Sequence, residues 1–167
     1  AHEQQAAVGY VHPFEPPAPD PGGEGSLTNA FPVDAALGLV DYYEVVGFAD
    51  PHTSADVWYG LLNCGIQVTA AGGTDAMANY TSLRGPVGIN RTYVHVPGLS
   101  DDPATRQRQW LDGLKAGITM ATNGPLVGLT VDDQRPGSTV NVSSRDGVVR
   151  VKGFMQSVIP VDHVELL

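Results

Sequence analysis

The sequence contains a single cysteine, Cys64, among its 167 residues. A lone cysteine excludes an internal disulfide and any cysteine-rich zinc site. Its place at the expected end of a helix predicts a buried and unreactive thiol. The sequence also lacks an apolar run long enough to cross a membrane, and its first residues lack the pattern of a secretory signal. We therefore expect a soluble chain with no membrane partner, and we expect any targeting segment to lie upstream of it.

Basic residues are also scarce. Nine Lys and Arg stand against 18 Asp and Glu, which gives a formal net charge of -9 at pH 7. No basic cluster offsets this acidic background, and that excludes a nucleic-acid partner or an anionic membrane surface. Residues 72–75 read Gly-Gly-Thr-Asp and lack the lysine and spacing of a phosphate-binding loop. A nucleotide is therefore not an expected ligand.

The chain divides into an α/β part and a β-rich part. In residues 1–125, short apolar runs alternate with helical patterns, which is typical of a parallel sheet with helices. In residues 126–167 the period changes to two between turn residues, which predicts a small sandwich-like region. Residues 1–7 are expected to be the last turns of a helix, and the carboxyl end stops in mid-pattern. Both ends are therefore expected to continue in a longer protein.

Two helices carry clear start and stop signals. Thr53 and Asp56 form a capping-box pair before an apolar helical face that ends at Gly65. Asp102 precedes a first-turn proline as an N-cap, and Gly117 stops that helix. Strands are expected over residues 8–11, 40–46, 67–71, 89–96, 126–131, 139–142, 148–154 and 161–167, with a hairpin turn at 145–147.

Three residues with metal-binding side chains recur at intervals of roughly 30, about one strand-helix unit of a barrel. His12 and Asp75 follow strand-like runs, and Glu44 lies inside one. Imidazole and carboxylate groups at the carboxyl ends of barrel strands suit zinc or manganese. The same residues also suit a structure without metal, in which His12 precedes a proline turn, Glu44 lies at a strand edge and Asp75 closes a turn.

Four further residues are weaker candidates for the same site. His52 follows the Glu44 strand, where it can serve as acid, base or ligand, or simply as an exposed loop histidine. Arg84 and Arg91 flank residues 85–88 and suit an anionic leaving group, although pairing with this acidic chain suits them equally. Asn79 follows Asp75, where barrels place substrate contacts.

Six motifs occur in a fixed order along nearly the whole chain: GYVHPF (9–14), PVDAALG (32–38), WYGLLNCG (58–65), GTDAM (73–77), RGPVG (84–88) and ATNGP (121–125). Together they resemble the CehA/McbA-type metallohydrolases of the polymerase and histidinol phosphatase (PHP) superfamily. The resemblance implies the carboxyl-terminal part of a distorted (β/α)7 barrel, over residues 1–125. It also implies two or three divalent ions (zinc, manganese or iron) and hydrolysis of phosphoester or carbamate and amide bonds in small molecules.

The resemblance also implies roles for particular residues. His12 matches the family's His-Pro ligand, and Asp75 matches its late aspartate. Many relatives have a histidine two positions after that aspartate, where this chain has Met77, a thioether unsuited to a hard ion. The family's opening His-x-His motif is expected upstream of Ala1. With the ligand set incomplete, the isolated chain is expected to be inactive.

Two expectations follow for the molecule as a whole. His12 and Asp75 should lie at the carboxyl ends of neighbouring parallel strands with converging side chains, and Glu44 should lie near them. The barrel edge before Val8 should be open, which favours a homo-oligomer. The competing class is a non-catalytic module that binds a carbohydrate or a protein partner.

Overall fold

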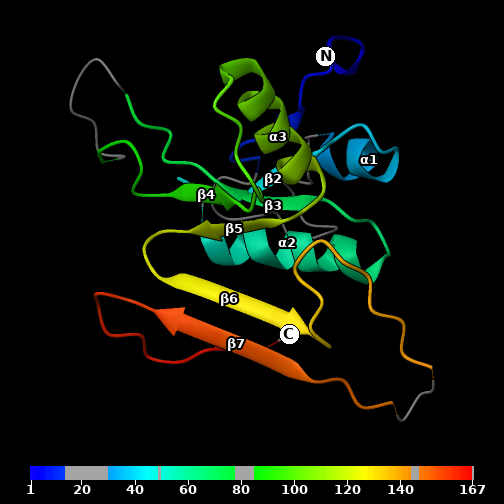
Figure 1. The fold of residues 1–167 in the computed structure, drawn as a ribbon, viewed down its shortest axis with the longest axis vertical. Coiled ribbons are helices and arrows are strands. Elements are labelled where there is room, and N and C mark those ends of the chain that lie inside the picture. The colour runs from blue at the N-terminus through cyan, green and yellow to red at the C-terminus, as the bar shows by residue number, and fades with distance from the viewer. Residues whose placement is uncertain (14–29, 49, 78–84, 144–146, 167) are drawn as a thin grey trace, which may run out of the picture.

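The computed structural model describes residues 1–13, 30–48, 50–77, 85–143 and 147–166. These residues form a mixed α/β fold with three helices and three small sheets (Figure 1). The elements in chain order are β1 (Gly9–Tyr10), α1 (Phe31–Ala36), β2 (Tyr42–Val46), α2 (Pro51–Asn63), β3 (Thr69–Gly72), β4 (Arg91–Val94), α3 (Pro103–Lys115), β5 (Thr119–Thr122), β6 (Leu126–Val131) and β7 (Val151–Gln156).

The first sheet is parallel and has the order β1-β2-β3. Tyr10 lies opposite Tyr43, and Glu44 lies opposite Ala71, with an irregularity before Val46. The expected α/β pattern of the amino-terminal part is therefore confirmed for these strands. Because all three run the same way, their carboxyl ends meet at one edge of the sheet.

One face of this sheet forms the core with α1 and α2. Alternate residues of β2, Tyr43 and Val45, point into it, and the ring of Phe31 stacks on that of Tyr43 at 4.3 Å between centroids. The indole N–H of Trp58 in α2 donates to the Val68 carbonyl at 2.7 Å, which ties the helix to the start of β3. Tyr42 and Glu44, which alternate with the core residues, face the other side of the sheet.

β4 and β5 form a separate antiparallel pair, so the parallel arrangement expected for the strand over residues 89–96 is wrong. The pair is joined to β3 by side chains rather than by a ladder. The hydroxyl of Thr92 bonds both the N–H and the carbonyl of Gly72, and the hydroxyl of Thr119 donates to the Ala70 carbonyl. Over the described ranges, the strands therefore do not close into a barrel.

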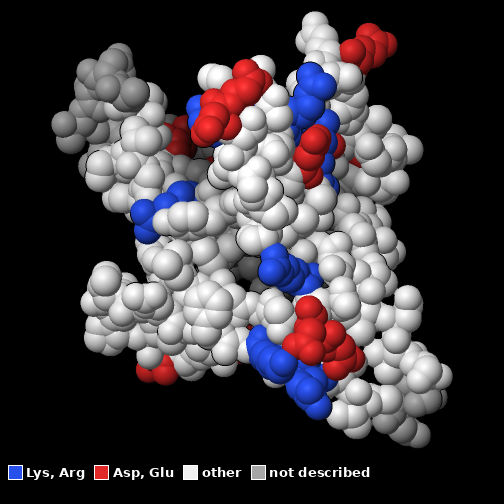
Figure 2. All heavy atoms as spheres, in the orientation of Figure 1, with Lys and Arg blue, Asp and Glu red and all other residues white. Residues whose placement is uncertain are grey.

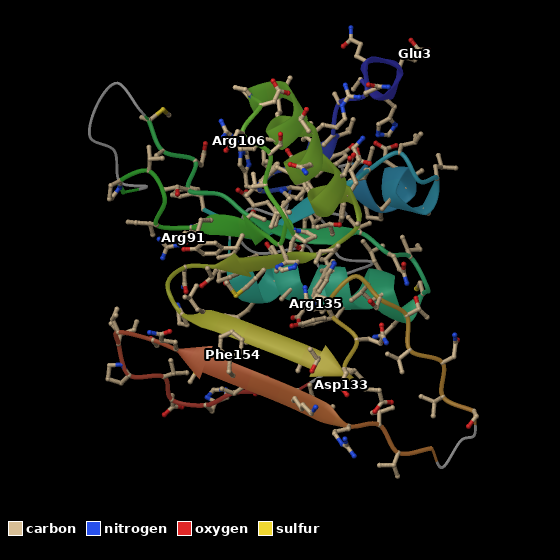
Figure 3. The ribbon with its side chains drawn as sticks, in the orientation of Figure 1. Glu3, Arg91, Arg106, Asp133, Arg135 and Phe154 are labelled. Atoms are coloured by element: carbon tan, nitrogen blue, oxygen red, sulfur yellow. The ribbon has the colours of Figure 1, made fainter. Side chains whose placement is uncertain are left out.

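The β-rich region contributes one antiparallel pair, β6 with β7. Residues 139–142 and the described part of 161–167 are not strands, because β6 and β7 are each other's ladder partners. Between them, Gln134 forms a single isolated bridge with Val131. The expected turn at 145–147 lies largely outside the described residues. Every residue of β7 is exposed, Phe154 to 67% (Figure 3). Figure 2 shows Lys and Arg side chains next to Asp and Glu side chains in the lower part of this face. Lys152 of β7 forms an ion pair with Asp133.

The observed helix ends can be compared with the capping residues expected from the sequence. Asp102 caps α3 as expected, and its carboxylate accepts the Thr105 N–H at 2.8 Å. The start expected for α2 is wrong by one turn, because Asp50 rather than Thr53 is its N-cap. Cys64 ends α2, but it is exposed rather than buried.

At the amino end, only residues His2–Gln4 are helical, as a single 3-10 turn, in place of the expected longer helix. Gln5 breaks the turn with a left-handed backbone conformation at φ 58°. The helix α1 has no counterpart among the expected elements. None of the helices in the described ranges has the length and apolar composition needed to cross a membrane.

Candidate functional site

The three residues expected as metal ligands lie along the same edge of the first sheet. His12 comes two residues after β1, Glu44 lies within β2, and Asp75 comes three residues after β3. All three strands are parallel, as expected for a site at strand ends. The two outer residues are not on neighbouring strands, however, because β2 lies between β1 and β3. Glu44 therefore takes the central position.

The carboxyl group of Glu44 is enclosed. The side chain is 6% exposed, and its Oε2 accepts the backbone N–H of His12 at 2.9 Å. Burial raises the pKa of Glu44 above its ordinary value, because the charged form loses its hydration. The His12 N–H and the positive charge of a protonated His12 oppose this rise in pKa, and the negative charge of Asp75 adds to it. The three groups are thus electrostatically linked.

Two glycines make room for this carboxyl group. A β-carbon on Gly47 would lie 2.5 Å from Glu44 Oε2, and one on Gly73 would lie 2.5 Å from Oε1. Contacts that short do not occur, so any larger residue at either position would displace Glu44 or the backbone. The loops after β2 and β3 therefore approach the carboxyl group from both sides.

Both outer residues have a left-handed backbone conformation. His12 has φ 34° and Asp75 has φ 53°. Such angles are uncommon for residues other than glycine and are stable only where the surrounding contacts impose them. Strained conformations of this kind concentrate at functional sites.

Thr74 fixes the loop that carries Asp75. It is buried, its hydroxyl donates to the Asn90 carbonyl at 2.8 Å, and it accepts the N–H groups of Gly88 and Asn90 at 3.0 and 3.2 Å. The Asn90 side chain in turn donates to the Gly47 carbonyl at 3.1 Å. The sequence did not suggest Thr74 or Asn90 as site residues. Thr74 and Asn90 are 16 positions apart and Asn90 and Gly47 are 43 apart, and no local pattern indicates hydrogen bonds over such separations.

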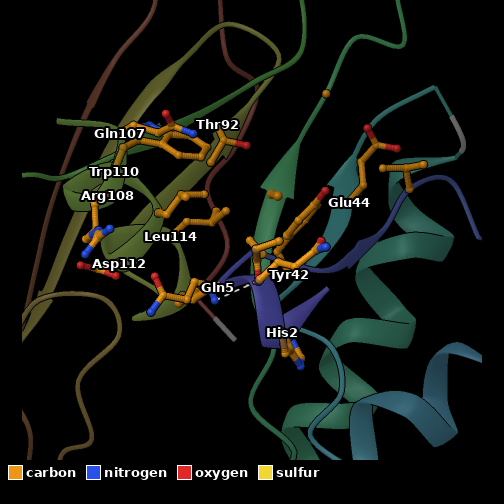
Figure 4. A pocket seen from close by; sticks show the side chains of 18 of the residues that line it. His2, Gln5, Tyr42, Glu44, Thr92, Gln107, Arg108, Trp110, Asp112 and Leu114 are labelled. Carbon is orange, nitrogen blue, oxygen red and sulfur yellow. Dashed lines mark hydrogen bonds between the residues drawn. The ribbon is translucent and has the colours of Figure 1, made fainter. Parts of the chain in front are cut away.

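An open cleft of about 1070 Å³ lies between this sheet and α3. Tyr42 and Glu44 belong to one wall, and Gln107, Arg108 and Trp110 of α3 belong to the other (Figure 4). Trp110 of α3 is 38% exposed and lines the cleft. The signal available in the sequence was an aromatic residue on an amphipathic helix, and that signal does not reveal which side of the sheet the helix covers.

The remaining candidates do not join this group. His52 is exposed in the first turn of α2, where its N–H donates to the Asp50 cap at 3.4 Å. Arg91 is half-buried in β4, with its guanidinium 5.8 Å from the centre of the Tyr93 ring. Neither is among the described residues that line the cleft. Asn79 and Arg84 lie outside the described residues.

The donor types at this edge suit a divalent ion, but the described ligand set is incomplete. Within residues 1–13, 30–48, 50–77, 85–143 and 147–166, no three His, Cys, Asp or Glu side chains are grouped closely enough to hold one. His12, Glu44 and Asp75 are therefore not grouped as a three-residue metal site in the part of the chain that the structure describes. No family model, curated protein or solved structure matches this chain.

Proposed function

We propose that this chain is part of a metal-dependent hydrolase that cleaves phosphoester or carbamate and amide bonds in small molecules. The observation that carries the proposal is that His12 and Asp75 follow the carboxyl ends of the parallel strands β1 and β3, with Glu44 of β2 between them. Active sites of α/β sheets and barrels form at this edge. The six motifs that resemble PHP-type metallohydrolases support the same function.

In this proposal the chain's own residues have distinct tasks. The imidazole of His12 and the carboxylate of Asp75 hold the ion, and the left-handed backbone at both residues sets the direction of their side chains. The Thr74 hydroxyl keeps the Asp75 loop in place. When bound, a divalent ion supplies a water of lowered pKa and a positive charge near the substrate oxygen. Further ligands come from outside the described residues.

The cleft provides access for a substrate. It is bounded by α3 on one side and reaches Val11, Glu44 and Gly73 on the other. His12 and Asp75 are not among its described lining residues, so a small molecule in the cleft would lie beside the segments that carry them. Trp110 offers a partly exposed aromatic face, and Gln107 and Arg108 offer hydrogen-bond donors. An organic ester or carbamate needs both kinds of contact.

The test is metal binding by the chain, followed by hydrolysis in the complete protein. His12→Ala and Asp75→Asn should each weaken Zn²⁺ or Mn²⁺ binding at least about tenfold, because the first removes the imidazole and the second removes the negative charge of the carboxylate. Each should also lower turnover of an aryl phosphate or aryl carbamate by several orders of magnitude. Calorimetric titration and metal content after gel filtration measure the binding.

Cys64→Ser is the matched control, since Cys64 is an exposed residue at the end of α2 and has no role in the proposal. It should leave metal content and turnover unchanged. Full metal content with near-normal turnover in the Asp75→Asn variant would contradict the metal site.

A non-catalytic binding module is the second candidate. It is favoured by the exposed apolar residues of the β6–β7 pair and by a cleft whose aromatic wall needs no metal. In that case, neither His12→Ala nor Asp75→Asn would alter binding of the module's carbohydrate or protein ligand, whereas Trp110→Ala would weaken it.

A further inference from the structure

The sequence predicts that Glu44 coordinates metal, but its contacts suit another task. Its Oε2 already accepts the His12 N–H at 2.9 Å and faces Gly47. Its Oε1 faces Gly73 at a distance that excludes even a methyl group. With the side chain only 6% exposed, both oxygens are directed at the backbone of the segments beside β2.

We propose that Glu44 is a positioning residue, whose carboxyl group holds the backbone of His12 and thereby aims the imidazole, rather than a ligand of the ion. The part that concerns metal rests on the proposed function. His12 has φ 34°, a conformation that persists only where a contact imposes it. The hydrogen bond from its N–H to Glu44 is such a contact, and it joins the end of β1 to the middle of β2.

Metal sites depend on contacts of this kind. A group that orients a ligand without touching the ion commonly changes metal affinity about 10–100-fold when it is removed. Gly47 and Gly73 also contribute to this positioning, because only glycine lets both loops lie this close to the Glu44 carboxyl group. Thr74, which follows Gly73, anchors that loop to Asn90.

The first experiment needs no metal. Amide hydrogen exchange at His12 is measured by NMR in the metal-free chain and in Glu44→Gln and Glu44→Leu. The glutamine keeps an oxygen that accepts the His12 N–H, so protection at His12 should be retained. The leucine has a similar volume and no acceptor, so protection should fall severalfold or more. Equal protection in all three proteins would overturn the positioning role.

Gly73→Ala is a second variant that keeps the carboxyl group but crowds it. It should also reduce protection at His12. Gly60→Ala is its matched control, since a β-carbon at that position of α2 meets nothing within 4 Å. Circular dichroism confirms that each variant is folded, and Gly73→Ala still tests the proposal if Glu44→Leu does not fold.

The second experiment titrates Co²⁺ and follows its visible absorption, which reports the ligands of the ion. Glu44→Gln should keep the affinity and spectrum of the unaltered chain, and Glu44→Leu should bind roughly 10–100-fold more weakly. The proposal would be overturned if Glu44→Gln changed the Co²⁺ spectrum and lowered the Co²⁺ affinity as much as His12→Ala does. Glu44 would then be a ligand of the ion. If neither the unaltered chain nor the complete protein, which supplies the further ligands, binds Co²⁺, the proposed function fails, while hydrogen exchange at His12 still decides the positioning role.

Discussion

At the scale of single residues, Phe31 is the central side chain of the core. It is fully buried, stacks on Tyr43 and lies 5.3 Å from the Tyr10 ring, centroid to centroid. Phe31→Ala should lower the free energy of unfolding by about 3–5 kcal/mol, because it removes buried surface and leaves a cavity. Urea unfolding followed by circular dichroism measures the change.

Val33 is the control for this substitution, because it lies on the same short helix and is 62% exposed. Val33→Ala should change stability by no more than about 0.5 kcal/mol. Similar effects for the two substitutions would mean that α1 does not pack on the sheet.

At the scale of elements, the start of α2 depends on Asp50. Its carboxylate accepts the N–H and the hydroxyl of Thr53 at 3.1 and 2.7 Å. The hydroxyl bond is the largest cause of a lowered pKa for Asp50. A carboxyl group whose pKa is lower in the folded state stabilises the fold above its unfolded pKa, near 3.9, and loses that effect as the pH falls through the folded value.

Asp50→Ala should therefore lower the thermal midpoint at pH 7, and the difference from the unaltered chain should shrink below about pH 4. Asp50→Asn keeps an N-cap without a charge, so it should remain closer to the unaltered chain at pH 7 and lack this acid-dependent loss. Thermal unfolding by circular dichroism at pH 3 to 7 gives the comparison. An alanine effect independent of pH would show that the ionised cap does not contribute.

At the scale of the whole molecule, open edges and apolar surface favour association. In the described residues β1 pairs with β2 alone, and β7 exposes Phe154 and Met155 to 67% and 43%. The chain should therefore form dimers or larger species as its concentration rises. Light scattering after gel filtration measures the mass, and a monomer over a wide concentration range would contradict the prediction.

Phe154→Ser tests whether the β6–β7 pair takes part in this association, and it should lower the mass at a given concentration. Val33→Ser, on an equally exposed site of α1, should not. If both variants associate like the unaltered chain, contact through the β1 edge is the remaining explanation.

The sequence by itself determined what depends on neighbours along the chain. Asp102 and Gly117 bound α3 as expected, because caps and left-handed stops act within one turn. The short apolar runs before His12 and Asp75 predicted strands, and the two residues do follow parallel strands. The start of α2 was misplaced because Asp50, Thr53 and Asp56 offer competing local caps, and Asp50 forms the bonds.

Only the tertiary structure decided how distant segments meet. Three features depend on segments that are not neighbours along the chain. They are the antiparallel pairing of β4 with β5, the hydrogen bond from the His12 N–H to Glu44, 32 residues away, and the hydrogen bonds of Thr74 with Asn90. The position of α3 relative to the sheet also depends on tertiary packing, and this position puts Trp110 in the cleft. Periodicity fixes which side of an element is apolar but not which partner it meets, because that choice depends on the packing of the whole chain.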